Sequence, residues 1–118
     1  MLIYYEKLFN IMKIRGKNTS RIREEKIIGQ ETLRKLKTGT GIFEEYKDPN
    51  NSTKDNPVFK RRITSIDTKA IESLCTWLEC TPNDIMEVIP NTIDNSERLC
   101  KILGCTVEEL PSKVPMEV

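Results

Sequence analysis

The 118-residue sequence predicts an all-α fold of packed helices, with a long loop or β-hairpin inserted at about 41–64 and an extra C-terminal helix pair. Three observations predict it. Apolar residues recur at three-to-four-residue spacing before and after the insertion, as they do on amphipathic helices. A run of turn-forming residues separates the two stretches. The last third contains an internal repeat at an offset of 25 residues, which duplicates a helix and the short helix after it.

Composition narrows the classes of function. The chain has four cysteines, no histidine, and 19 Lys+Arg against 18 Asp+Glu. Without histidine there is no His-based catalytic triad, no His-ligated zinc and no imidazole base. No apolar run approaches the roughly 20 residues needed to cross a bilayer, and no signal peptide is recognisable. We therefore expect a cytoplasmic binding protein with no cofactor, no membrane contact and no enzymatic activity.

The near-neutral total charge conceals an asymmetry along the chain. Residues 1–40 carry ten Lys/Arg against four Asp/Glu, a net charge of +6. Residues 41–62 carry +1, and residues 63–118 carry four against ten, a net charge of −6. A polyanion would be attracted to the first third of the chain and repelled by the last.

Three helices are predicted before the insertion. The first covers residues 5–15 and ends at Gly16. Asn18, Thr19 and Ser20 offer N-cap oxygens for a second helix through about residue 26. A tight turn bending at Gly29 leads to a third helix over residues 30–37. The expected internal positions of the last two helices are Ile22, Ile28, Leu33 and Leu36.

The insertion is centred on ten turn-forming residues at 48–57. Its flanks, 42–46 and 58–63, are rich in β-branched and aromatic residues. A long-looped hairpin and a mobile excursion both fit this pattern, and the sequence does not separate them.

The internal repeat aligns residues 72–85 with residues 97–110. Each copy is predicted as a helix, a break at its second Cys-Thr, and a short second helix. The predicted helix starts are marked by N-terminal residue pairs, which are Thr81 with Pro82, Thr106 with Glu109, and Asp94 with Glu97.

The four cysteines, at positions 75, 80, 100 and 105, form two C-x4-C pairs. We interpret them as small buried hydrophobes, because they lie on apolar helical stripes or at helix ends. Metal binding or redox sensing is the alternative. Trp77 shares its helix with apolar residues at core spacing, so we predict a core position rather than a base-stacking one.

The stretch from Asn18 to Gly39 predicts a helix-turn-helix whose third helix directs polar side chains outward. These outward residues are Gln30, Glu31, Arg34, Lys35 and Lys37. Gln can pair with adenine, Arg or Lys with guanine, and Glu can accept from cytosine. The alternative is a solvated amphipathic helix with no ligand.

Residues 5–12, 31–36 and 71–87 resemble the lambda-repressor-like, or XRE-family, helix-turn-helix of small bacterial or phage regulators. The resemblance covers residues 2–37 and about 65–90. It implies five packed helices and dimers on operator half-sites. The chain length predicts a single domain, which we divide into a core at 2–38 and 65–90, the insertion at 41–64 and a helical extension at 91–118. The sequence departs from the family pattern at Arg23, at Ile27 and in the insertion.

These features together predict a homodimeric, sequence-specific regulator that binds double-stranded DNA. Base contacts are expected from Gln30, Glu31, Arg34 and Lys35. Phosphate contacts are expected from Asn18, Thr19, Lys37, Lys60, Arg61 and Arg62. The insertion has two other readings, as a solvent-facing loop or as a protein contact through Phe43, Tyr46, Val58 and Phe59. The alternative function is a protein-interaction module, antitoxin-like or a phage-derived inhibitor, whose partner meets the insertion or the acidic C-terminal region.

Overall fold

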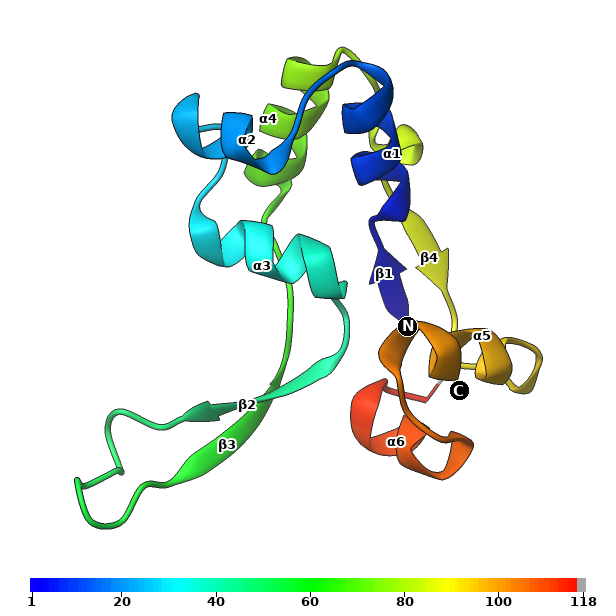
Figure 1. Ribbon diagram of the computed structural model, residues 1–118. Coiled ribbons are helices and arrows are strands. Elements are labelled where there is room, and N and C mark those ends of the chain that lie inside the picture. Colours follow the sequence, from blue (N-terminus) through cyan, green and yellow to red (C-terminus); the bar gives the residue numbers. More distant parts are fainter. Residues whose placement is uncertain (117–118) are drawn as a thin grey trace.

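The computed structural model describes residues 1–116 and shows a mixed α/β fold, 48% helical and 15% strand (Figure 1). The prediction of an all-α, five-helix fold is therefore wrong. The helices are α1 (Glu6–Ile14), α2 (Thr19–Glu24), α3 (Gln30–Thr38), α4 (Thr68–Leu78), α5 (Ser96–Leu103) and α6 (Leu110–Lys113), with short 3-10 turns η1 (Pro82–Asp84), η2 (Ile93–Asn95) and η3 (Val107–Glu109). The strands are β1 (Leu2–Tyr4), β2 (Phe43–Lys47), β3 (Phe59–Ile63) and β4 (Glu87–Ile89). Among the helices of residues 1–116, none is long and apolar enough to cross a membrane.

The first sheet explains the error in fold class. Strands β1 and β4 pair antiparallel, with Leu2 opposite Ile89, and both side chains are buried. Ile3 also exchanges two backbone hydrogen bonds with Thr40, at 2.9 and 3.0 Å. Each strand is three residues long, which is too short for an alternating pattern to be visible. Only the long-range pairing makes these segments strands.

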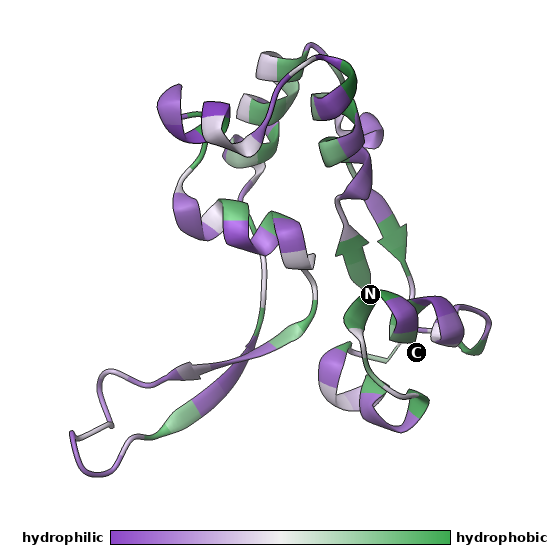
Figure 2. Cartoon of the chain, viewed as in Figure 1, coloured by the Kyte–Doolittle hydropathy of each residue, from purple (hydrophilic) through white to green (hydrophobic). Residues whose placement is uncertain are grey.

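The second sheet is the hairpin β2–β3, so the inserted segment is a hairpin rather than an excursion without strands. Gly41, just before it, has a φ of 77°, and a Cβ there would lie 2.3 Å from the Met1 carbonyl oxygen. The turn-forming residues start at Asp48, whose carboxylate accepts from the Asn50 N–H at 2.9 Å. Figure 2 shows the connection between β2 and β3 as hydrophilic, whereas β1 is hydrophobic. The loop end of the hairpin projects away from the helices (Figure 1), whereas the start of β2 lies close to α3 and α6.

Two hydrophobic clusters hold the described chain together. The larger joins α1 to α4 and contains ten buried residues, which are Tyr5, Leu8, Met12, Ile22, Leu33, Leu36, Leu74, Cys75, Leu78 and Ile85. The smaller contains four, which are Leu2, Ile89, Leu99 and Leu110. The predicted interior positions Ile22, Leu33 and Leu36 are buried, but Ile28 is only half-buried. Trp77 is also half-buried at the edge of the larger cluster, because its indole N–H reaches Glu25 at 3.3 Å.

The helix starts of the repeat agree with the prediction at Thr81 and Thr106 but not at Asp94. Thr81 and Thr106 precede η1 and η3 as predicted, and each donates its hydroxyl at 3.0 Å to the carboxylate three residues later. Asp94 is not a helix cap. It lies inside η2, and α5 begins at Ser96 after Asn95. The Asn95 amide is instead used to hold the preceding turn, donating to Pro90 at 3.1 Å.

Candidate nucleic-acid interface

Helices α2 and α3 are anchored to the rest of the fold by apolar side chains on their inner sides. Ile22 of α2 and Leu33 and Leu36 of α3 are buried in the larger cluster. The side chain of Asn18 caps α2 by accepting from the Arg21 N–H at 3.1 Å. Because the apolar side of α3 packs inward, its polar side must face outward. This is the arrangement that groove binding by α3 needs.

The four predicted base-contacting residues lie on α3 but not in equivalent positions. Gln30, Glu31 and Arg34 are exposed. Lys35 is half-buried, and its Nζ donates to the Ser65 carbonyl oxygen at 3.1 Å. Gln30 has the least restricted side chain of the four, because no hydrogen bond or ion pair is recorded for it within residues 1–116. It stands at the first residue of α3.

Arg34 lies in an ion-pair cluster that joins α3 to the hairpin. Its guanidinium contacts Glu31 on the same helix, and its Nη2 lies 3.1 Å from Glu44 Oε2 on β2. The other oxygen of Glu44 accepts from Arg62 on β3, at 2.9 Å from Nε and 2.8 Å from Nη2. The Arg62 guanidinium also lies over the Tyr46 ring, 4.6 Å from its centroid. Two arginines and two glutamates thus link the outward side of α3 to the hairpin.

The cluster changes the protonation of its members in a consistent direction. The hydrogen bond from Arg34 lowers the pKa of Glu31. Partial burial would raise the pKa of Glu44, but hydrogen bonds from Arg62 and Arg34 outweigh it and lower the pKa. The hydrogen bonds to Glu31 and Glu44 raise the pKa of Arg34. All these groups are therefore charged at neutral pH.

This pairing limits what Arg34 can donate to a base. Its Nε donates to Glu31, and its Nη2 donates to both Glu31 and Glu44, which leaves the two hydrogens of Nη1. A bidentate contact with guanine needs two donors in a fixed fork. Arg34 must therefore release one carboxylate before it can read guanine with two hydrogen bonds.

The predicted phosphate-contacting residues also differ in how available their side chains are. Asn18 and Lys37 are exposed and Thr19 is half-buried. In the hairpin, Lys60 pairs with Asp48 at 3.0 Å, and Arg62 pairs with Glu44. Hydrogen bonds from Asn51, Asn50 and Lys60 lower the pKa of Asp48 to about 2.

Arg61 is different from its two neighbours. Within residues 1–116 it has no carboxylate at ion-pair distance, and its guanidinium lies 4.1 Å from the Phe43 ring centroid. Of the three consecutive cations of β3, Lys60 and Arg62 are thus paired inside the hairpin, whereas Arg61 has no ion pair within residues 1–116.

Sequence reasoning missed three groups of this interface, Glu44, Asp48 and Ser65. All three come from the inserted segment or its end, and each engages a residue predicted to bind DNA. The two adjacent glutamates of β2, opposite the basic strand β3, are a signal for the first of them, because opposite charges across a ladder stabilise pairing. That signal requires the hairpin register, which the sequence alone does not provide.

The cysteines offer no metal centre in the described part of the chain. All four are free thiols, Cys75 buried and the others half-buried. No group of three or more Cys, Asp or Glu residues within residues 1–116 is arranged to hold a metal ion.

No protein-family model, no curated protein and no solved structure matches the chain.

Proposed function

We propose that this protein binds double-stranded DNA sequence-specifically as a cytoplasmic transcriptional regulator, with α3 in the major groove. The observation that carries the proposal is the outward side of α3. Leu33 and Leu36 anchor the opposite side, and Gln30, Glu31, Arg34 and Lys37 remain exposed. The hairpin touches this side at Glu44 without burying it.

Charge distribution supports the proposal. The segment that contains α2 and α3 carries a net charge of +6, which favours approach to a polyanion. Figure 1 places α5 and α6 beside β1 and β4, apart from α2. The C-terminal region does reach the end of α3, where Ile102, Leu103 and Lys113 line a pocket with Lys37 and Thr38, but Gln30 at the start of α3 is exposed. The resemblance of residues 2–37 to XRE-family proteins points the same way.

Within this proposal the residues have separate roles. Gln30, at the start of α3, pairs with a base edge directly, whereas Arg34 exchanges a carboxylate for guanine. Lys37 and the N-terminus of α2 at Asn18 and Thr19 contact phosphates, where backbone N–H groups favour anions. One such domain reads only a few base pairs, so a homodimer on a palindromic site is part of the proposal.

The internal ion pairs favour a second candidate, the protein-interaction module. Arg34, Lys60 and Arg62 are each paired with a carboxylate, which lowers their availability for phosphates. A scaffold that binds another protein through its hairpin would show DNA binding that is weak and independent of sequence.

One experiment separates the two candidates. Genomic fragments are selected on the purified chain at moderate salt, and the best fragment is compared with random competitor DNA and footprinted. A sequence-specific regulator gives a specificity ratio of about 10³ or more and a discrete protected site. A ratio near one rules out the regulator and leaves the protein-interaction module.

A further inference from the structure

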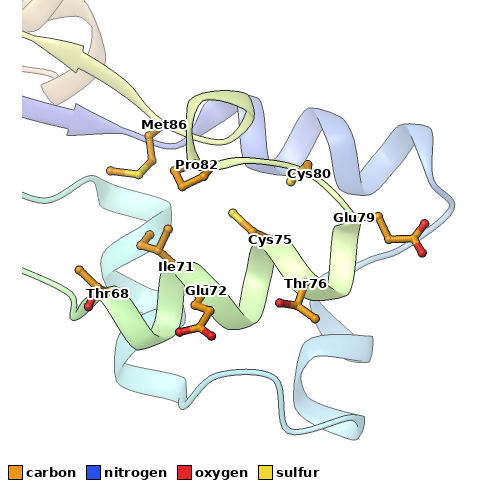
Figure 3. A pocket seen from close by; sticks show the side chains of 9 residues that line it. All are labelled: Thr68, Ile71, Glu72, Cys75, Thr76, Glu79, Cys80, Pro82 and Met86. Carbon is orange, nitrogen blue, oxygen red and sulfur yellow. The ribbon is translucent and has the colours of Figure 1, made fainter.

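The described chain has an open groove on the side of α4, formed with the segment that runs from η1 into β4 (Figure 3). Its volume is about 680 Å³, within the roughly 300–1,000 Å³ typical of binding clefts. Its floor is apolar and consists of Ile71, Cys75, Cys80, Pro82 and Met86. Such a floor stabilises a partner by removing apolar side chains from water.

The rim of the groove is acidic. Glu72 and Glu79 are both exposed at its edge, one near the middle of α4 and one just after its end. Both belong to the part of the chain that carries a net charge of −6. If two copies packed this surface against itself, these carboxylates would repel one another. The groove therefore fits a segment that presents apolar side chains together with positive charge.

One exposed segment of the chain has this composition. Phe59, Arg61 and Ile63 alternate along β3, so they lie on the same face of the hairpin. Phe59 is 61% exposed and Ile63 is 52% exposed, which is unusual for two large apolar side chains on one short strand. Arg61 stands between them and has no carboxylate partner within residues 1–116.

The other face of β3 is satisfied within the hairpin. Lys60 and Arg62 point to that face and pair with Asp48 and Glu44. The Phe59 face also carries Phe43, Glu45 and Lys47 of β2, so Lys47, Arg61 and Glu45 give it a net charge of +1. Near Arg61 this face borders Ser112 and Lys113 of α6, whereas Phe59 and Ile63 remain exposed. Because the hairpin projects from the body, this face can be presented to another molecule (Figure 1).

We propose that the β2–β3 hairpin of one copy docks in the α4 groove of a second copy, and that the second copy returns the same contact. Phe59 and Ile63 fill the apolar floor, and Arg61 meets Glu72 and Glu79 on the rim. Reciprocal exchange places each contact twice and closes the assembly as a dimer with two-fold symmetry. The contact requires no DNA, so it stands apart from the proposed regulator function.

The first test is sedimentation equilibrium of the full chain in the absence of DNA. The unchanged protein is expected to be a dimer, and Phe59→Ser is expected to raise the dimer dissociation constant at least about tenfold. Ile93→Ser is the matched control, because Ile93 is 93% exposed but lies in η2, outside both surfaces. A monomer throughout the micromolar range overturns the proposal. A dimer that Phe59→Ser leaves unchanged also overturns it.

A charge exchange tests which carboxylates meet Arg61. The single variant Arg61→Glu is expected to weaken the dimer. The double variant Glu72→Lys, Glu79→Lys is also expected to weaken it. Combining all three changes in one chain is expected to restore it, because the charges are again complementary. All three positions are exposed to solvent, and far-UV circular dichroism verifies that each variant is folded. Additive weakening in the triple variant contradicts the docking.

Thiol reactivity locates the contact on the groove. Cys80 lines the groove, whereas Cys105 occupies the equivalent place in the second repeat copy outside it. Alkylation of Cys80 is expected to be slower in the dimer than in Phe59→Ser, with Cys105 unaffected. Equal rates for Cys80 in both proteins overturn the proposal. A chain that passes these tests but fails the fragment selection retains the dimer and loses the regulator function.

Discussion

The two copies of the internal repeat have the same backbone conformation at the end of their helices, but they pack against different elements. In the first copy the N–H of Cys80 donates to Cys75 O at 3.0 Å, and in the second the N–H of Cys105 donates to Cys100 O at 3.1 Å. This six-residue bond closes a Schellman motif at the end of each helix, α4 and α5. In both copies a cysteine pair supplies the apolar contact that accompanies the motif, which gives the C-x4-C spacing a structural reason.

The two copies differ in how deeply their apolar side chains are buried. Leu78 at the end of α4 is fully buried, whereas its counterpart Leu103 at the end of α5 is half-buried. The first copy faces α1, α2 and α3 and contributes to the ten-residue cluster, whereas the second faces β1 and β4 and contributes to the four-residue cluster. Local sequence therefore determines how each copy turns, and the elements opposite determine how much each stabilises the fold.

The largest expected effect compares two fully buried leucines, one from each repeat copy. Leu74 and Leu99 occupy equivalent repeat positions and both are 0% exposed. Leu74→Ala is expected to lower the free energy of unfolding by about 4 kcal/mol and Leu99→Ala by about 2–3 kcal/mol, because the smaller cluster can relax around the cavity. Urea unfolding followed by circular dichroism measures both. A larger loss from Leu99→Ala would reverse our ranking of the two clusters.

The next effect concerns binding and compares two paired arginines. Arg34 of α3 and Arg98 of α5 each pair with glutamates, Arg98 with Glu87 at 2.7 Å. Arg34→Ala is expected to weaken specific DNA binding by about 1–3 kcal/mol, because a base contact is lost. Arg98→Ala is the control and is expected to leave affinity unchanged, since Arg98 pairs with Glu87 on β4 rather than with a residue of α3. Fluorescence anisotropy on the selected fragment measures both variants.

Equal losses from the two arginine variants would mean that Arg34 acts only through fold stability. If Arg34→Ala keeps the same preference for the selected site, Arg34 does not contact a base. Of the pair Gln30 and Arg34, Gln30 would then be the remaining candidate for base contact.

A smaller effect on stability is expected at the residue with left-handed backbone conformation that follows α4 in the first copy and α5 in the second. Glu79 has a φ of 55° and Gly104 a φ of 65°, so the first copy carries a side chain where the second carries none. Gly104→Ala is expected to lower the free energy of unfolding by about 1 kcal/mol, because a Cβ is disfavoured in this conformation. Glu79→Gly is expected to raise it by about 0.5 kcal/mol. Thermal unfolding of both variants checks the opposite signs, and two changes of the same sign would contradict this account.

The same comparison indicates how far sequence reasoning reaches. The helix starts after Thr81 and Thr106 were predictable because a cap depends on residues three apart. Strands β1 and β4 were not, because Leu2 becomes part of a strand only by pairing with Ile89, which lies far along the sequence. On the candidate interface, the outward side of α3 followed from the spacing of its leucines. The pairing of Arg34 with Glu44 did not, since it depends on where the hairpin lies.

The smallest expected effect is the pH dependence of the first copy's cap. Hydrogen bonds from the backbone N–H and the hydroxyl of Thr81 lower the pKa of Asp84 from 3.8. A carboxyl whose pKa is lower in the folded state stabilises the fold above about pH 4, and this contribution is lost as the pH falls through its folded value. Asp84→Asn is therefore expected to be less stable than the unchanged chain at pH 7, and the difference should shrink below pH 4. Urea midpoints between pH 7 and pH 2.5 measure it, and a difference that stays constant over this range would show that the charge of Asp84 does not contribute through the cap.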